Sequence, residues 1–206
     1  MSLAFLFGKG LLIGLSVAAP VGPIGVLCIN RTLSEGPRAG FVTGLGAAVA
    51  DGTYGAVAAF GIASVSLFLL DHQDLIRGLG GLGLIALGLH MGLRRPAERG
   101  AEDRGFRGLL SAFASCFLLT LANPATILSF VAIFAALGLA DRPGDLLAAL
   151  IMVLGVFLGS ALWWLGLAGV VGRIRHRVSK GVLLWINRGS GSVLGLFGLL
   201  ALVSLL

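Results

Sequence analysis

The chain consists largely of long apolar stretches with almost no charge. Stretches at about residues 39–70, 108–137 and 146–172 each contain at most one Asp, Glu, Lys or Arg. A helix needs about 20 apolar residues to cross a hydrocarbon core of about 30 Å. Only 12% of the residues are charged, about half the share that is usual in soluble domains. The sequence therefore predicts a polytopic membrane protein.

Six membrane spans are predicted, and they divide into two sets of three. The spans cover about residues 5–30, 39–70, 78–93, 108–137, 146–172 and 182–206. Because an odd number of spans reverses the second set, we expect an all-α integral membrane protein built from two inverted three-helix repeats. One transmembrane domain (1–206) would comprise repeat one at about 1–93, a cytoplasmic linker at about 94–107 and repeat two at about 108–206. Glycines spaced four apart, such as Gly155 and Gly159, suit close packing of helices in lipid.

Lys and Arg gather in three of the five loops. Twelve lie in or near the loops after the first, third and fifth spans, two lie in the other loops, and Lys9 lies near the start. The twelve are Arg31, Arg38, Arg94, Arg95, Arg99, Arg104, Arg107, Arg173, Arg175, Arg177, Lys180 and Arg188. By the positive-inside rule these loops are cytoplasmic and both termini external, in a multi-pass protein of the cytoplasmic (inner) membrane. The net charge of +6 is thus a topology signal, and no nucleic-acid partner is expected.

Proline interrupts the first span of each predicted repeat. The first break is A-A-P-V-G-P, with Pro20 and Pro23 around Gly22, and the second is A-N-P at Asn123 and Pro124. Proline removes a backbone donor and clashes with the preceding turn, and in lipid the freed groups must face protein or a water-lined cavity. Counted along the chain from the flanking charges, both breaks fall near the bilayer centre. Broken helices at matching places in inverted halves predict a substrate site, so these five residues are candidates for it.

Asp51 is the only acidic residue inside a predicted span. A carboxylate at such depth is costly and usually faces the bundle interior, where it marks a pathway or a proton relay. We predict that Asp51 lines the substrate site and carries the coupling proton; pairing with a substrate ammonium and a purely structural hydrogen bond are the alternatives. Tyr54 one turn later, and Trp163 beside Trp164 in the fifth span, are further candidates for the cavity wall, although packing also explains them. Asn123 could bind a zwitterion through its amide or cap the following half-helix.

No pattern in the sequence predicts an enzyme. There is no nucleophile elbow, phosphate loop or metal-ligand helix, so no catalytic residue, cofactor or metal is expected. The two cysteines, Cys28 and Cys116, have neither C-x-x-C spacing nor the spacing of a disulfide framework.

Three segments resemble the LysE/RhtB family of amino-acid exporters. They are A-A-P-V-G-P-I-G-V-L-C-I at 18–29, G-x-x-x-G-x-x-x-G-L-G-A-A-x-A-D at 36–51 and T-L-A-N-P-A-T-I-L at 120–128. The resemblance extends over nearly the whole chain through the six-span layout. Ala125 stands where the family's second motif often has Lys, and the first proline motif is one residue longer than the usual Pro-Gly-Pro. The resemblance implies a secondary transporter that exports amino acids or related small metabolites and is driven by a proton or ion gradient.

Two other functions stay open. Related six-span proteins shuttle thiol electrons with one cysteine in span 1 and one in span 4, as Cys28 and Cys116 are placed here. Cys28 follows Pro23 by five residues, whereas Cys116 precedes Pro124 by eight, and this asymmetry argues against an electron shuttle. The broken helices and Asp51 argue against the third function, a non-transporting scaffold. The expected partners are a small-molecule substrate and membrane lipid, and a homo-oligomer is left open.

Overall fold

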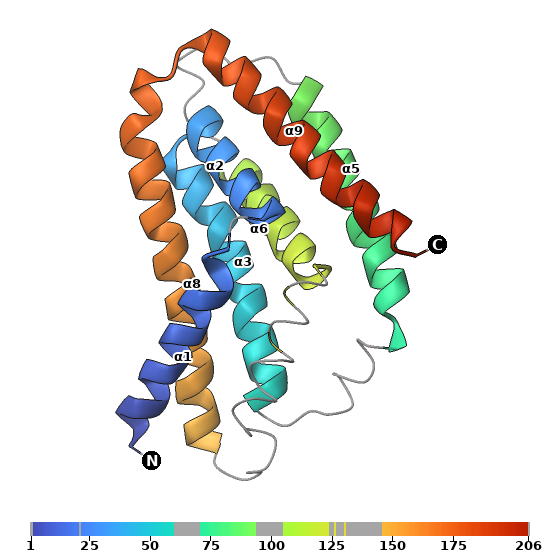
Figure 1. The fold of residues 1–206 in the computed structure, drawn as a ribbon. Helices are drawn as coiled ribbons and strands as arrows, with labels where there is room; N and C mark the ends of the chain where they lie inside the picture. The colour runs from blue at the N-terminus through green and yellow to red at the C-terminus, as the bar shows by residue number, and fades with distance from the viewer. Residues whose placement is uncertain are drawn as a thin grey trace.

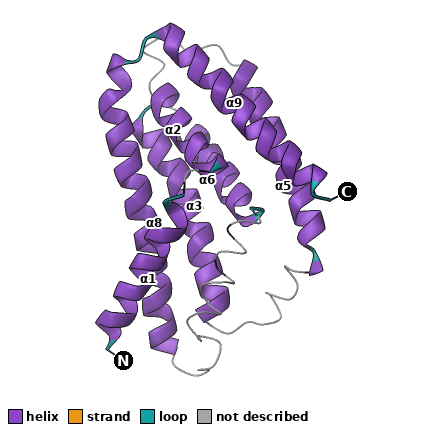
Figure 2. Cartoon of the chain, viewed as in Figure 1, coloured by secondary structure: helices purple, strands orange, loops and turns teal. Residues whose placement is uncertain are grey.

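The computed structural model describes residues 2–20, 22–59, 71–93, 105–123, 126, 130 and 146–205. These residues form seven α-helices and one 3-10 helix, and no strand occurs among them (Figures 1 and 2). The elements are α1 (Leu3–Ala18), α2 (Pro23–Glu35), α3 (Pro37–Ala59), α5 (Gln73–Leu93), α6 (Phe106–Leu121), α8 (Leu146–Ile174), the 3-10 helix η2 (Arg175–Arg177) and α9 (Lys180–Val203).

Three of the described helical segments are long and apolar enough to cross a membrane. They are Asp74–Leu93, Leu146–Arg177 and Gly181–Val203. α1 and α2 together make a fourth span if the bend of 80° between them is counted as a break within one span. α6 is a shorter apolar helix of 16 residues. The prediction of an all-α, multi-pass protein is confirmed at this level. The third predicted span begins earlier than expected, since α5 starts at Gln73 rather than near residue 78.

The bundle is apolar on its outer surface and partly polar inside. Large side chains such as Leu93 on α5 and Trp185 on α9 are 81% and 71% exposed. The interior instead holds small and polar side chains, among them Thr43 and Ser160, which are fully buried. This is the reverse of a soluble protein and fits a surface that is covered by lipid, because polar groups in hydrocarbon must find partners inside the protein.

The glycines let helices approach until their backbones touch. α5 and α9 run antiparallel, and a Cβ atom on Gly88 would lie 2.6 Å from the carbonyl oxygen of Gly191. Seven residues earlier on α5, a Cβ atom on Gly81 would lie 2.9 Å from the carbonyl oxygen of Gly198. Small residues at helix contacts are typical of membrane bundles.

Glycines also bring the backbones of α1 and α8 into contact. The prediction for Gly155 and Gly159 is confirmed: a Cβ atom on Gly155 would lie 2.5 Å from the Phe7 carbonyl oxygen, and one on Gly159 would meet that of Leu11. The order of these contacts makes α1 and α8 parallel. α6 packs against α3 and runs parallel to it, whereas α3 and α8 are antiparallel neighbours (Figure 1). α2 contacts α3 and α8, and it also contacts α9 of the α5–α9 pair.

The described ends of the basic loops lie at one end of the bundle. The α2–α3 turn, η2, the end of α5 and the start of α6 all lie in the upper part of Figure 1. The Arg175 side chain joins two of these loops, because its Nε donates a hydrogen bond to the carbonyl oxygen of Leu33 at 3.0 Å.

The placement of Arg31 in a cytoplasmic loop is wrong. α2 continues to Glu35, five residues beyond the predicted end of the first span, and Arg31 is buried within it. Its guanidinium donates hydrogen bonds to the Thr43 hydroxyl at 3.2 Å, to the Ala112 carbonyl oxygen at 2.9 Å and to the Ser115 hydroxyl at 3.0 Å. Arg31 therefore ties α2 to α3 and α6 rather than marking the membrane boundary.

Candidate functional site

The break in the first span lies at the centre of the site. α1 ends at Ala18, and Pro20, which has no N–H group, cannot extend it. α2 begins at Pro23, whose fixed φ suits the first position of a helix, after Gly22 in an extended conformation. The predicted break at these prolines is confirmed. Since the two helices meet at 80°, residue counts along the chain do not measure depth, and the depth estimated from the flanking charges is not supported.

The N-terminus of α2 offers unsatisfied backbone donors. No side chain caps it, and the first backbone N–H that finds an acceptor within the described chain is that of Val26, which donates to the Gly22 carbonyl oxygen at 3.1 Å. The N–H groups of Ile24 and Gly25 have no acceptor among the described residues. A helix N-terminus carries partial positive charge and favours anions.

A cavity of about 60 Å³ lies where this break meets α3, α6 and α8. The structure brings together in its wall five of the predicted site residues, which are Pro20, Gly22, Pro23, Asp51 and Asn123. Pro124 lies outside the described residues. The volume is enough for a few ordered water molecules. An amino acid would need more room, so binding would require the surrounding helices to move apart.

Asp51 reaches this cavity from α3 and is 2% exposed. The Ser160 hydroxyl on α8 donates to its Oδ2 at 2.7 Å, and the Trp164 Nε1 donates to the Ser160 Oγ at 3.1 Å. Because an indole N–H is only a donor, the hydroxyl hydrogen of Ser160 is directed at the carboxyl group. This fixes Oδ2 as an acceptor. Oδ1 has no hydrogen-bond partner within the described part of the chain and is the oxygen left for a proton or a cation.

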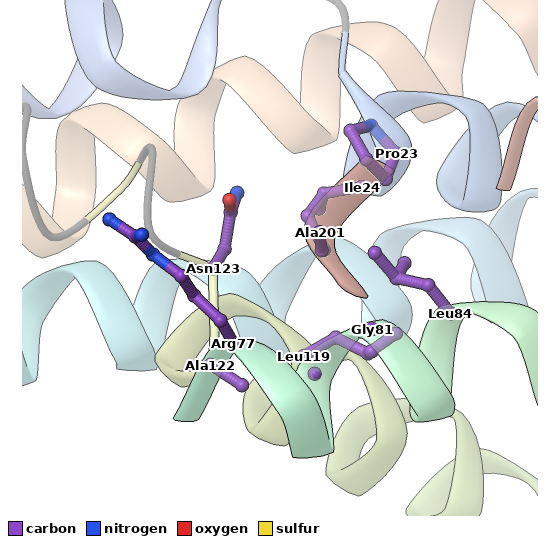
Figure 3. Close-up of a pocket in the computed structure, with 10 residues that line it drawn as sticks. Pro23, Ile24, Arg77, Gly81, Leu84, Leu119, Ala122, Asn123 and Ala201 are labelled. Carbon is purple, nitrogen blue, oxygen red and sulfur yellow. The ribbon is translucent and has the colours of Figure 1, made fainter. Parts of the chain in front are cut away.

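The second break forms another wall of the cavity. α6 ends at Leu121, and the backbone N–H of Asn123 donates to the Thr120 carbonyl oxygen at 3.2 Å. Asn123 also lines a smaller cavity of about 20 Å³, which is bordered by α5 and α9. Figure 3 shows the Asn123 amide and the Arg77 guanidinium extending along the same side of this second cavity. Pro23 and Ile24 line both cavities, so α2 forms their common wall.

Two predicted site residues lie outside the cavity wall. Tyr54 is buried, its ring stacks on Phe130 at a centroid distance of 5.6 Å, and its hydroxyl donates to the Leu121 carbonyl oxygen at the end of α6. Trp163 is partly buried against the core, and its neighbour Trp164 lines the cavity instead. Both arrangements are the packing role that the sequence left open for these aromatic residues.

The two cysteines meet in the core between α2 and α6. Both are free and buried, they belong to the same cluster of the core, and the two thiols are close enough to influence each other. Their unequal distances from the two breaks, which argued against an electron shuttle, therefore do not prevent them from sharing one part of the core.

Sequence reasoning missed the polar residues that complete the site. Ser160 supports Asp51, and Thr120 and Thr126 line the cavity. The two threonines flank the Asn-Pro motif, so the motif itself could have pointed to them. Ser160 gives a weaker signal: it is a lone hydroxyl in an apolar run, four residues before Trp164, and thus on the same helix face.

A cavity lined by buried polar groups between broken helices, inside an apolar bundle, defines a multi-pass membrane transport protein. The family model described as LysE type translocator matches residues 15–205. The chain belongs to the LysE type translocator family, a family of transporters rather than enzymes. The resemblance noted from its motifs is thereby confirmed.

Two curated relatives cover most of the chain. A Bacillus subtilis (strain 168) protein, YcgF, whose name provisionally describes an amino acid efflux protein, is 27% identical over 94% of this chain and 93% of its own length. The uncharacterized membrane protein YahN of Escherichia coli (strain K12) is 28% identical over 83% of this chain and 77% of its own length. No solved structure matches the chain.

Proposed function

We propose that this protein is a secondary transporter that exports amino acids or related small metabolites across the cytoplasmic membrane, coupled to a proton or ion gradient. One observation carries the proposal: the only acidic residue of the predicted spans lines a cavity at the break between α1 and α2. The provisional name of the Bacillus subtilis relative agrees with this substrate class.

The two sides of the cavity suit the two charges of an amino acid. The free Oδ1 of Asp51 is an acceptor for an ammonium group or a site for the coupling proton. The uncapped N-terminus of α2 would receive the carboxylate through the N–H groups of Ile24 and Gly25, as helix N-termini in broken transporter helices do. Asn123 can donate to that carboxylate or accept from the ammonium.

The coupling role is the one that we favour for Asp51. Among the residues described as lining its cavity there is no basic side chain, so no fixed cation there compensates a buried carboxylate. Loading with a proton on one side of the membrane and release on the other would move one charge per cycle. The Ser160 hydroxyl stabilises one carboxyl oxygen and leaves the other free for this proton.

The proposed architecture is six spans in two inverted three-helix repeats, with loops after spans one, three and five in the cytoplasm. The helix contacts support it. α1 runs parallel to α8, and the equivalent helix of the second repeat, α6, runs parallel to α3 (Figure 1). The antiparallel pairs α3–α8 and α5–α9 would each lie across the axis that relates the repeats. α1 and α6 are both 16 residues long and both end at a proline-containing break.

The experiment is counterflow and gradient-driven uptake in liposomes that contain the purified protein, screened against a panel of amino acids. With Asp51→Asn, a proton role predicts that substrate exchange continues while accumulation driven by a pH gradient is lost. An ammonium-binding role predicts that binding itself weakens, since the substrate charge loses its partner in a low dielectric. Asp74→Asn, an exposed acid at the start of α5, is the control. Full gradient-driven transport by Asp51→Asn would leave Asp51 a structural residue.

The position of Cys28 and Cys116 in one buried cluster of the core favours a second candidate function, a thiol electron shuttle. We expect the double variant Cys28→Ala with Cys116→Ala to export the solute normally. Loss of export by a well-expressed double variant would promote the electron shuttle.

A further inference from the structure

We propose that Cys28 and Cys116 form a site of reversible oxidation, at which a hydroperoxide such as hydrogen peroxide joins the two thiols into a disulfide that links α2 to α6. Both thiols are free, they lie in the same buried cluster of the core close enough to influence each other, and they come from helices far apart in sequence. They are the only cysteines of the chain, so no other thiol of the protein competes for either partner.

The contact between the two helix faces does not depend on the thiols. Arg31 lies three residues after Cys28 and therefore on the same face of α2. Its guanidinium bonds to Ala112 and Ser115, which lie just before Cys116 on α6. This charged side chain holds the cysteine-bearing faces of α2 and α6 together. The helix packing thus brings the two cysteine-bearing faces together in the core.

The cavity comes within about one helical turn of each cysteine. Ile24 and Thr120 line the cavity, and each lies four residues from one of the cysteines, about one helical turn of 5.4 Å away. Hydrogen peroxide is little larger than water, and the cavity of about 60 Å³ can hold a few waters.

The reaction proceeds in two balanced steps. The sulfur of one cysteine attacks a peroxide oxygen, the O–O bond breaks, and a sulfenic acid and one water are formed. The second thiol then attacks the sulfenic sulfur, the S–S bond forms, and its proton leaves with the hydroxyl group as a second water. Two thiols are oxidised, one hydroperoxide is reduced, and a dithiol such as dithiothreitol reverses the reaction by exchange.

The consequence for transport rests on the proposed function. α2 belongs to the first predicted repeat and α6 to the second, and both form walls of the cavity through Pro23, Ile24 and Thr120. A cavity too small for an amino acid must open by separating these walls. The disulfide would prevent the separation next to the site, so the oxidised protein is expected to retain its fold and lose transport.

The test compares wild type with Cys28→Ser, Cys116→Ser and the double variant, all in liposomes and after treatment with hydrogen peroxide. Intact mass under denaturing conditions detects the loss of two hydrogens, and counterflow is measured before and after treatment. We expect wild type alone to form the disulfide and to lose counterflow, with recovery after dithiothreitol. The single variants, which cannot close the bridge, should keep transporting.

Three results would overturn the proposal. Treated wild type that keeps two free thiols would remove the site. A disulfide that forms at an unchanged counterflow rate would remove the effect on transport, and an equal loss of counterflow in all variants would place the damage elsewhere. The mass readout does not depend on the solute. If reduced wild type moves no amino acid, the proposed function fails while the oxidation site is still tested.

Discussion

The Ser160 hydroxyl group fixes the orientation of the Asp51 carboxyl group at the cavity. The Ser160 hydroxyl accepts a hydrogen bond from the Trp164 indole N–H and donates one to Oδ2 of the Asp51 carboxyl group. The carboxyl group is thereby oriented by a chain of two hydrogen bonds that starts on the same helix, α8. Loss of the hydroxyl would free the carboxyl group to rotate and would leave the indole N–H without its acceptor.

Ser160→Ala should therefore slow transport without unfolding the protein. Leaving a buried polar group unpaired costs about 1–3 kcal/mol, and the carboxyl group loses its fixed orientation. We expect a lower rate of gradient-driven transport at an unchanged expression level, measured in liposomes. Thr53→Val is the matched control, because Thr53 is an exposed hydroxyl on α3 that bonds only to its own helix, at Val49. Equal rates for Ser160→Ala and wild type would show that the serine does not orient Asp51.

Tyr54→Phe should cost stability rather than substrate affinity. The Tyr54 hydroxyl satisfies the carbonyl oxygen of Leu121, where α6 ends and carbonyl groups lack helical partners. Its removal should lower the free energy of unfolding by about 1–3 kcal/mol, seen as a lower melting temperature in detergent. The phenyl ring can still stack on Phe130, and substrate affinity measured by binding should stay within about twofold. A marked loss of affinity at unchanged stability would return Tyr54 to the substrate site.

At the level of single residues, the sequence identified only those cavity residues whose type is rare in a membrane span. A lone carboxyl group and proline pairs are costly in lipid, so the sequence was enough to identify Asp51 and Pro20 as cavity residues. It was not enough for Ser160, because hydroxyl side chains are common in membrane helices. The role of Ser160 depends on the register between α3 and α8, which brings it opposite Asp51, and no local pattern encodes that register.

At the level of helices, glycines bring the backbones of α5 and α9, and those of α1 and α8, into contact. α5 and α9 meet at glycines that recur seven residues apart on both helices, at Gly81 and Gly88 and at Gly191 and Gly198. The spacing of glycines predicted close packing but not the partners, because 33 glycines offer too many equivalent combinations. The helix boundaries were also imprecise: polar residues can lie within a buried helix, as Arg31 does in α2.

Gly88→Ala should destabilise the α5–α9 pair. The new Cβ atom would lie 2.6 Å from the carbonyl oxygen of Gly191, and overpacking of this kind costs about 1–3 kcal/mol. We expect a lower melting temperature in detergent. Gly92→Ala, one turn later on the same helix, has no atom within 4 Å of the new Cβ and should be neutral or slightly stabilising. If the two variants melt alike, α5 and α9 are not in backbone contact.

At the level of the whole molecule, orientation follows from where the cations lie. Arg31 is part of the core, but the other basic residues still favour the loops after spans one, three and five. The described ends of those loops lie together in Figure 1, which one common membrane face requires. The positive-inside rule then predicts that this face is cytoplasmic.

Cysteine labelling checks this orientation in a background with Cys28→Ser and Cys116→Ser. Ala101→Cys, in the linker, should react with a membrane-impermeant thiol reagent only after the cells are permeabilised. Ser2→Cys, next to the exposed N-terminal end of α1, should react in intact cells because both termini are expected outside. The reverse labelling pattern would invert the topology, and the direction of transport would have to be reassigned with it.

The bond between Trp164 and Ser160 has a spectroscopic consequence. Indole emission depends on the polarity around the ring and on the hydrogen bond of its N–H group. The N–H group of Trp164 is linked to Asp51 through the Ser160 hydroxyl. The chain has three tryptophans, and Trp163→Phe with Trp185→Phe would leave Trp164 as the only one. A proton or a substrate that arrives at Asp51 would then shift the colour or intensity of the emitted light, so that the occupancy of the site could be followed in real time without a label.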